Sequence, residues 1–304
     1  MTFYLSSPNG ATHYASYGPY GRNGSYGSYG NVQPPATFYY VTPATQWAAH
    51  NDPGMRQKAQ PLTFVLVHGS WADAGFWDGV AAELRKQGHT VYAPEYPGHG
   101  ADYKNTTATH AMMSKAVADY IQNHDLRDVV LVGHSFGGSV VQKAAEYVPD
   151  RLKRIVFIDG FVAKDGSSLA DELPPQGKAF FSGLAEQSGN NTIMLPFPFF
   201  RDAFVNLAPL ELAQKLYAGI KPEPAGPLFE KLDLKKFYEL QTPKSYVYLY
   251  QDNVLPQGEG YGWHPHMSSR LGQFRLIVGN ADHMTYFKTE PKKIAELLYM
   301  AGRD

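Results

Sequence analysis

Ser135 lies in a five-residue pattern that is typical of nucleophilic serines. Gly133-His134-Ser135-Phe136-Gly137 matches G-x-S-x-G, in which a sharp turn lifts the serine hydroxyl clear of its neighbours. The apolar run VVLV before the pattern predicts a strand, and SVVQKAAEYV after it predicts a helix. Glycines flank the serine because a Cβ would clash where the chain doubles back, and the helix N-terminus directs N–H groups at the site. The pattern in this setting predicts that Ser135 is a catalytic nucleophile.

A serine hydroxyl attacks only when a base takes its proton, and that base needs an acid to orient it. His283 follows the last predicted strand, in GNADHM, and Asp252 follows the strand SYVYLY, in QDN. Both lie at the carboxyl ends of strands, where open α/β sheets place their sites. Asp159, at the end of VFID, is the alternative acid. Asp282 is discounted because consecutive side chains on an extended loop point apart.

Hydrolysis through a tetrahedral intermediate also needs hydrogen-bond donors for the developing oxyanion. The backbone N–H of Phe136, directly after the nucleophile, is one expected donor. The second is expected from the loop His68-Gly69-Ser70-Trp71 after the first apolar strand, where the N–H of Ser70 is best placed and its hydroxyl can add to it. Ser70 and Phe136 are therefore the predicted oxyanion hole.

The elements that must position these residues alternate along the chain from Pro61 onward. Six apolar runs predict strands: LTFVLVHG, HTVYAPEY, DVVLVGHS, RIVFIDG, SYVYLYQD and QFRLIVGN. Helical spacing occurs in VAAELRKQG, HAMMSKAVADYIQNH, SVVQKAAEYV and EPKKIAELLYM. Alternation of this kind predicts an α/β fold, with a mostly parallel central sheet and helices on both faces. Between about residues 161 and 243 the alternation breaks down, and this proline- and aromatic-rich stretch predicts a cap insertion.

Residues 1–60 form a Tyr/Gly/Ser-rich N-terminal extension, and residues 61–304 form the predicted main domain. The heart of the extension, HYASYGPYGRNGSYGSYG, has almost no aliphatic side chains and cannot build a core of its own. Two interpretations stay open: a flexible or surface-draped tail, or an aromatic strip that covers the main domain or a partner subunit.

Charge and composition restrict the partners. The 304 residues hold 27 Lys and Arg against 28 Asp and Glu, a net charge of −1, which gives no electrostatic footprint for nucleic acid. No stretch has the roughly 20 apolar residues that span a bilayer. The N-terminus shows neither the basic nor the apolar region of a signal peptide, and cysteine is absent. We therefore expect a cytoplasmic protein with neither nucleic-acid nor membrane partners.

One histidine pair raises the question of a metal. His264 and His266 flank a proline in WHPHM, and a His-x-His pair can bind zinc. No third ligand accompanies them in the sequence, so surface or structural roles are favoured. The prediction is that the protein uses no metal and no cofactor.

From about Pro61 to the C-terminus, the chain resembles the plant methylesterase and hydroxynitrile lyase branch of the α/β-hydrolase superfamily, with its bacterial esterase relatives. Four stretches carry the resemblance: VLVHGSWADAGFW, APEYPGHG, LVGHSFGGSVVQKAAE and NADHMTYFKTEPKKIAELL. The segment IKPEPAGPL in the predicted cap is similar to bacterial members. The resemblance implies an α/β-hydrolase fold and the triad Ser135, Asp252 and His283.

Two positions favour ester cleavage over cyanohydrin lysis within that branch. Its lyases resemble one another in a Thr after the first His of the HG-like loop and a Lys after the catalytic His. This chain has Gly69 and Met284 there. Since Met284 supplies no positive charge for a leaving cyanide, the resemblance implies an esterase. Dehalogenases and epoxide hydrolases of similar architecture use an aspartate where this chain has Ser135.

The predicted function is hydrolysis of a carboxylic ester, or lactone, of a small apolar or aromatic substrate, through an acyl-enzyme at Ser135. Aromatic residues in the predicted cap suit such a substrate; they are Phe180, Phe181, Phe197, Phe199 and Phe200. A C–C-bond hydrolase of the β-diketone type would use the same triad and stays an alternative. A non-catalytic small-ligand-binding protein on the same scaffold is the other. The sequence leaves a homodimer open.

Overall fold

The computed structural model describes residues 3–6, 12–15, 39–41, 60–255 and 260–304. Its main feature is a seven-stranded sheet in the order β3-β11-β10-β7-β6-β4-β5, in which every neighbouring pair is parallel. All six predicted strands are present: β4 (Thr63–Val67), β5 (Thr90–Tyr92), β6 (Val129–His134), β7 (Leu152–Ile158), β10 (Lys244–Leu249) and β11 (Arg275–Gly279). The α/β fold with its parallel sheet is confirmed.

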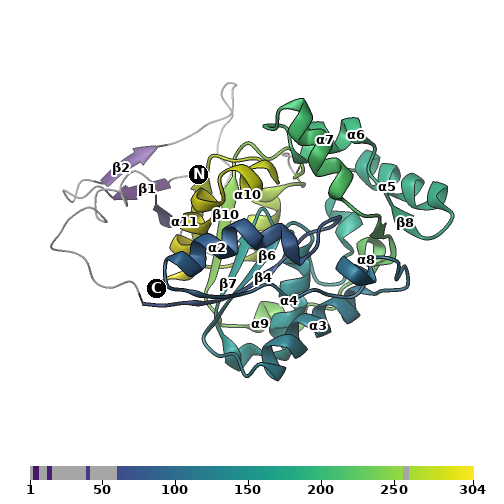
Figure 1. The fold of residues 1–304 in the computed structure, drawn as a ribbon. Helices are drawn as coiled ribbons and strands as arrows, with labels where there is room; N and C mark the ends of the chain where they lie inside the picture. Colours follow the sequence, from purple (N-terminus) through teal and green to yellow (C-terminus); the bar gives the residue numbers. More distant parts are fainter. Residues whose placement is uncertain (1–2, 7–11, 16–38, 42–59, 256–259) are drawn as a thin grey trace, which may run out of the picture.

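Helices cover both faces of this sheet (Figure 1). Helices α2 (Asp78–Lys86) and α11 (Pro291–Gly302) pack on one face, with Phe64 and Leu66 of β4. Helices α3 (His110–Asn123) and α4 (Gly137–Tyr147) pack on the other. Strand β6 is buried along its whole length because both of its faces are covered. Within the described residues, no helix is long and apolar enough to cross a bilayer.

Between β7 and β10 the chain leaves the alternating pattern. The helices and short strands there are α5 (Pro175–Ser188), β8 (Thr192–Ile193), α6 (Phe197–Phe199), α7 (Leu210–Gly219), β9 (Glu223–Pro224), α8 (Gly226–Phe229) and α9 (Lys235–Glu239). Strands β8 and β9 pair with each other as a separate antiparallel ladder. Figure 1 shows α5, α6 and α7 gathered at one end of the molecule. Beyond β11, the short helix α10 (Thr285–Thr289) leads into α11.

Three short strands fall within residues 1–60. β1 (Phe3–Ser6) and β2 (Thr12–Ala15) form an antiparallel pair, and β3 (Tyr39–Val41) extends the main sheet beside β11. The sequence analysis predicted none of these strands, because glycine and serine dominate the segment. The rest of the Tyr/Gly/Ser-rich extension lies outside the described residues.

Candidate active site

Ser135 lies at the turn between β6 and α4, in a backbone conformation that few non-glycine residues adopt. Its φ is +54°, in the left-handed region that costs an L-residue about 1 kcal/mol or more. Surrounding hydrogen bonds hold it there, because the carbonyl of Ser135 accepts the N–H of both Gly138 and Phe161 at 2.9 Å. This conformation places Ser135 where the elbow contacts the chain that follows β7.

The glycines of the elbow are required by crowding. A Cβ on Gly133 would lie 2.4 Å from the carbonyl oxygen of Gly137, and a Cβ on Gly137 would lie 2.4 Å from that of His68. Real Cβ atoms essentially never come so close to a carbonyl oxygen. A Cβ on the next glycine, Gly138, would lie 2.6 Å from the carbonyl oxygen of Phe161. The G-x-S-x-G spacing therefore reflects the close approach of three backbone segments.

Asp252 and His283 come together as the sequence predicted for a base and its acid. His283 Nδ1 donates to Asp252 Oδ2 at 2.6 Å, and both side chains are almost fully buried. Nε2 of His283 is buried and makes no hydrogen bond within the described chain. Ser135 Oγ is not hydrogen-bonded to it in this structure. Such bonds are commonly long or absent without substrate and tighten when it binds, so the pair leaves Nε2 available to a proton from the serine.

Charge explains why Asp252 suits the role of the acid. Burial alone would raise the pKa of Asp252, but the neighbouring imidazole of His283 and the N–H of Val254 hold that pKa below its ordinary value. Asp159, the alternative acid, lies behind Asp252 and is fully buried. Asp282 is used elsewhere, since Oδ1 accepts the N–H of Thr285 at 2.9 Å at the start of α10.

His134, the variable residue of the elbow, ties the nucleophile to the base. Its Nε2 donates to the backbone carbonyl of His283 at 3.0 Å, and the two rings lie 4.5 Å apart. Burial, followed by the neighbouring His283, lowers the pKa of His134 well below its ordinary value, so its ring is neutral at physiological pH. The sequence analysis gave His134 no role, because the motif leaves this position free.

The two predicted oxyanion donors line the same cavity as Ser135. Within the described chain, the N–H groups of Ser70 and Phe136 have no hydrogen-bond acceptor, which leaves both free for a substrate oxygen. Trp71, the next residue, adopts a φ of +58°.

The cavity in front of Ser135 is lined mainly by apolar side chains. Its volume is about 60 Å³. Beyond the elbow and oxyanion loop, side chains from the segment between β7 and β10 dominate its walls: Phe161, Leu169, Leu173, Phe181, Phe199, Phe204 and Leu228. Of the five predicted phenylalanines, Phe181 and Phe199 line it, whereas Phe180, Phe197 and Phe200 pack elsewhere.

A buried glutamate from β9 fastens this segment to the oxyanion loop. Glu223 Oε2 accepts the N–H of Trp71 at 2.8 Å and a hydrogen bond from His99 Nε2 at 2.9 Å. Trp71 Nε1 donates to the carbonyl of Ile193 in β8 at 2.8 Å. Burial would lower the pKa of His99, but the charge of Glu223 raises it. Sequence reasoning missed Glu223, whose only signal was its place in IKPEPAGPL.

His110 supports the elbow from α3 as a neutral ring. Ser139 Oγ donates to the carbonyl of Phe136 at 2.8 Å, and His110 Nε2 lies 2.9 Å from that hydroxyl. Nδ1 of His110 faces the hydroxyl of Ser114 at 3.3 Å. Burial lowers the pKa of His110 to about 3, and the charge of Lys143 adds to the effect.

His110 is expected to make the fold sensitive to mild acid. Its pKa is about 3 in the folded state and about 6.5 unfolded, so between these values the unfolded chain binds more protons and stability falls as pH falls. We expect the wild type to lose about 2 kcal/mol more than His110→Gln between pH 7.5 and 5. Urea unfolding of both proteins at the two pH values measures it. Equal losses would show that His110 does not titrate in this way.

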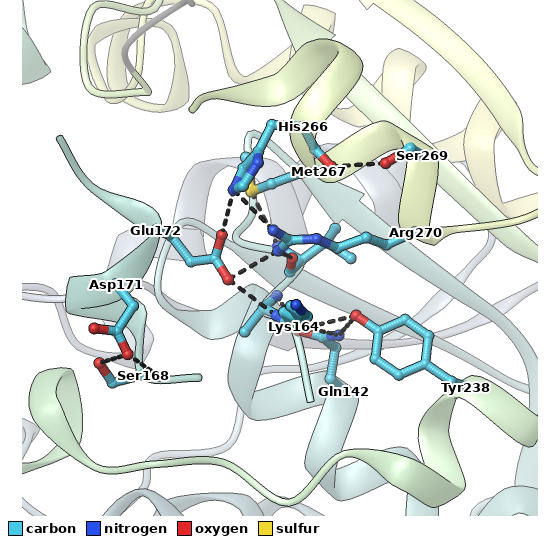
Figure 2. A network of polar contacts seen from close by, with 12 residues as sticks. Gln142, Lys164, Ser168, Asp171, Glu172, Tyr238, His266, Met267, Ser269 and Arg270 are labelled. Atoms are coloured by element: carbon cyan, nitrogen blue, oxygen red, sulfur yellow. Dashed lines mark hydrogen bonds and ion pairs between the residues drawn. The ribbon is translucent and has the colours of Figure 1, made fainter. Parts of the chain in front are cut away.

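A second polar network holds the chain just beyond β7 (Figure 2). Glu172, which is buried, accepts hydrogen bonds from His266 Nε2 at 2.7 Å, Arg270 Nη1 at 2.8 Å and the N–H of Lys164 at 3.0 Å. Gln142 of α4 binds the backbone of the same stretch, at Ala163. The network gives His266 a structural role.

His264 takes part in a different contact. Its Nδ1 lies 2.7 Å from the hydroxyl of Ser268, so the two histidines of WHPHM do not face a common ligand. Of the described residues, only Asp159, Asp252 and His283 form a group of three whose ligating atoms all lie within 4.8 Å of one another.

The two positions that separated esterase from lyase fit the geometry. A Cβ on Gly69 would lie 2.7 Å from the Cβ of Ser135 and 3.1 Å from the carbonyl oxygen of His134, so a threonine there would have to displace the nucleophile. Met284 is buried among apolar side chains. Neither position offers a cation to a leaving group.

The match to known families covers most of the chain. Residues 64–297 match the model of the alpha/beta hydrolase family. The chain belongs to the α/β-hydrolase family. In this α/β-hydrolase, the turn at Ser135 joins β6 to α4, which is the strand-to-helix elbow that the sequence predicted.

Individual relatives of this α/β-hydrolase are esterases by name. A carbendazim-hydrolysing esterase of Nocardioides sp. is 37% identical over 126 residues, or 40% of this chain and 52% of the relative. Putative methylesterase 14 of Arabidopsis thaliana is 24% identical over 255 residues, or 77% of this chain and 70% of the relative. The chain thus spans about half the length of the first of these. Ester hydrolysis is the activity that these names share.

Solved structures give the same picture. An extracellular α/β-hydrolase from a Paenibacillus species, reported to share structural and functional homology with tobacco salicylic acid binding protein 2, is 62% identical. It covers 80% of this chain and 100% of its own, with a TM-score of 0.78. Methylesterase MES16 of Arabidopsis is 19% identical, covers 79% of this chain and 98% of its own with a TM-score of 0.60, and shows the shared fold.

Proposed function

We propose that this α/β-hydrolase cleaves a carboxylic ester or lactone of a small apolar or aromatic acid through an acyl-enzyme at Ser135. One observation carries the proposal: Asp252 holds His283 by Nδ1 at 2.6 Å and leaves Nε2 free. An imidazole fixed in that tautomer is a base for a serine proton. The free N–H groups of Ser70 and Phe136 add the charge stabilisation that acyl transfer needs.

The proposed reaction runs in two halves. His283 Nε2 takes the proton of Ser135 Oγ as that oxygen attacks the ester carbonyl, and the negative carbonyl oxygen is held by the two backbone N–H groups. His283 then gives the proton to the leaving alkoxide, which departs as the alcohol. Water attacks the acyl-enzyme with its proton going to the same nitrogen, and the acid leaves as Ser135 recovers its hydrogen.

The lining of the cavity supports an apolar or aromatic acyl group. Phe181, Phe199 and Phe204 form its walls with Trp71, and aromatic side chains offer flat surface for ring stacking. The name methylesterase among the relatives suggests that the ester is a methyl ester. The Paenibacillus enzyme is described as similar to a protein that binds salicylic acid, which is an aromatic acid. We propose short alkyl esters of aromatic acids as the first substrates to test. We also propose that residues 161–243 form a cap over this pocket.

The experiment offers the purified protein a methyl ester of an aromatic acid, a lactone and a β-diketone, and measures acid release. A fluorophosphonate probe is added in parallel and its attachment site is mapped by peptide mass. Ester hydrolysis with label on Ser135 is expected. Cleavage of the β-diketone alone would indicate a C–C-bond hydrolase, and a folded protein that neither turns over nor takes the label would indicate a binding protein.

The compartment needs its own test. The sequence analysis predicts the cytoplasm, whereas the 62%-identical Paenibacillus relative is described as extracellular. Because that relative shares so much of this sequence, we propose that the protein is exported. Immunoblots of cell extract and culture supernatant from the source organism decide between the two locations.

A further inference from the structure

Asp159 lies directly behind the proposed catalytic acid and is not used by the mechanism above. It follows β7, and its φ of +36° is in the left-handed region, which is unusual for a residue other than glycine. Its backbone N–H donates to the carbonyl oxygen of Val247 at 3.0 Å, and its Oδ1 accepts the N–H of Leu249 at 2.8 Å. Both partners belong to β10, so the neighbouring strand fixes Asp159 in this strained position.

The carboxyl groups of Asp159 and Asp252 lie close together: an oxygen of each lies within 4.8 Å of the other and of a ring nitrogen of His283. Both side chains are sealed from solvent, at 0% and 2% exposure. The second oxygen of Asp159, Oδ2, receives no hydrogen bond from any donor of the described chain. A carboxylate oxygen would be left buried without a partner there, whereas a protonated one becomes a donor that Asp252 can accept.

Two carboxylates in contact inside a protein cannot both be ionised, and the better-stabilised one keeps the charge. Asp252 faces His283 and accepts the N–H of Val254. Asp159 accepts one backbone N–H, that of Leu249, and forms no ion pair within the described residues. Burial raises the pKa of Asp159 well above its ordinary value, and the charge of Asp252 raises it further.

The other ionisable groups around the pair do not change this order. Asp282 adds a negative charge that also favours the neutral form of Asp159, and its own carboxylate is occupied at the start of α10. Burial, followed by the nearby carboxyl groups of Asp159 and Asp252, raises the pKa of Tyr246 and of Tyr248, so both phenols stay neutral. His283 is the one basic group of the cluster.

We propose that Asp159 is a positioning residue that carries a proton at neutral pH and donates it in a hydrogen bond to Asp252. The bond orients Asp252 toward His283 Nδ1 and shares its negative charge. Without this donor, Asp252 would be more basic and would bind the protonated form of His283 more strongly. His283 would then lose its proton only at higher pH. This proposal rests on the proposed function, in which His283 is the base.

Two variants test the role through the pH dependence of kcat/KM on the ester. Asp159→Asn keeps a neutral donor of the same shape, so its activity should stay within about threefold of the wild type and its acid limb should not move. Asp159→Ala removes the donor, so kcat should fall about tenfold or more. Its acid limb should move up by about half a pH unit or more.

An acid limb that moves down in Asp159→Asn would overturn the proposal, because it would mean that a negative charge had been removed. A fall in kcat for Asp159→Ala with an unmoved acid limb would also overturn it, since a structural role alone explains that result. Melting temperatures of both variants show whether each is folded under assay conditions.

A second readout does not depend on turnover. A buried protonated carboxyl group gives its own infrared C=O stretch, which we expect in the wild type at pH 7 and in the surface control Asp150→Asn, but not in Asp159→Asn. Its absence from the wild type would refute the protonated state. Should the protein hydrolyse no ester and take no fluorophosphonate, the proposed function fails, and the infrared band still decides where the proton is.

Discussion

Replacing Ser135 by alanine is expected to lower kcat for the ester by about 10⁴-fold or more while leaving the protein folded. Oγ is the only atom lost, and it makes no hydrogen bond within the described chain, so stability has little to lose. The crowded glycines and the hydrogen bonds to the Ser135 carbonyl are untouched. Initial rates on the aromatic methyl ester, with active protein quantified by absorbance, measure the effect.

The matched control is Ser269→Ala, which removes an exposed hydroxyl that does not line the cavity. We expect wild-type rates and wild-type fluorophosphonate labelling from it. Ser135→Ala should take no label at all, and its melting temperature should match that of the wild type. Residual hydrolysis within tenfold of the wild type would place the nucleophile elsewhere and remove the basis of the proposed function.

Asp252→Asn is expected to be nearly as damaging, lowering kcat by about 10⁴-fold. Asp252 accepts the Nδ1 hydrogen of His283 at 2.6 Å. An asparagine that accepts a proton from Asp159 through its oxygen turns its NH₂ group toward His283. Nδ1 must then accept rather than donate, which puts the hydrogen on Nε2 and removes the base. KM should change little, because Asp252 does not line the cavity.

Asp150→Asn, at an exposed position of a short 3-10 helix, is the control for loss of one negative charge. It should match the wild type in rate and in pH profile. The double variant Asp159→Asn with Asp252→Asn gives the coupling between the two acids, since contacting groups are expected to be non-additive. Substantial activity in Asp252→Asn that disappears in the double variant would mean that Asp159 serves as the acid in its place.

The chemistry of this protein was readable from the sequence where it depended on local pattern. Ser135 and its glycines lie within one turn, so the spacing alone reported the crowding between Gly133 and Gly137. The six strands were equally readable, because a parallel sheet covered on both faces needs continuous apolar runs. His283 and Asp252 followed from their places after strand ends.

Tertiary structure decided what depends on segments far apart in the chain. Whether Asp159 or Asp252 faces the imidazole is set by how β7 and β10 align, and no residue pattern records that alignment. Glu223 reaches Trp71 across 152 positions, and Phe204 enters the cavity although the sequence favoured its neighbours. The sequence by itself determined that Ser135 could attack; only the packing of distant segments decided which acid aligns its base, and which rings its substrate meets.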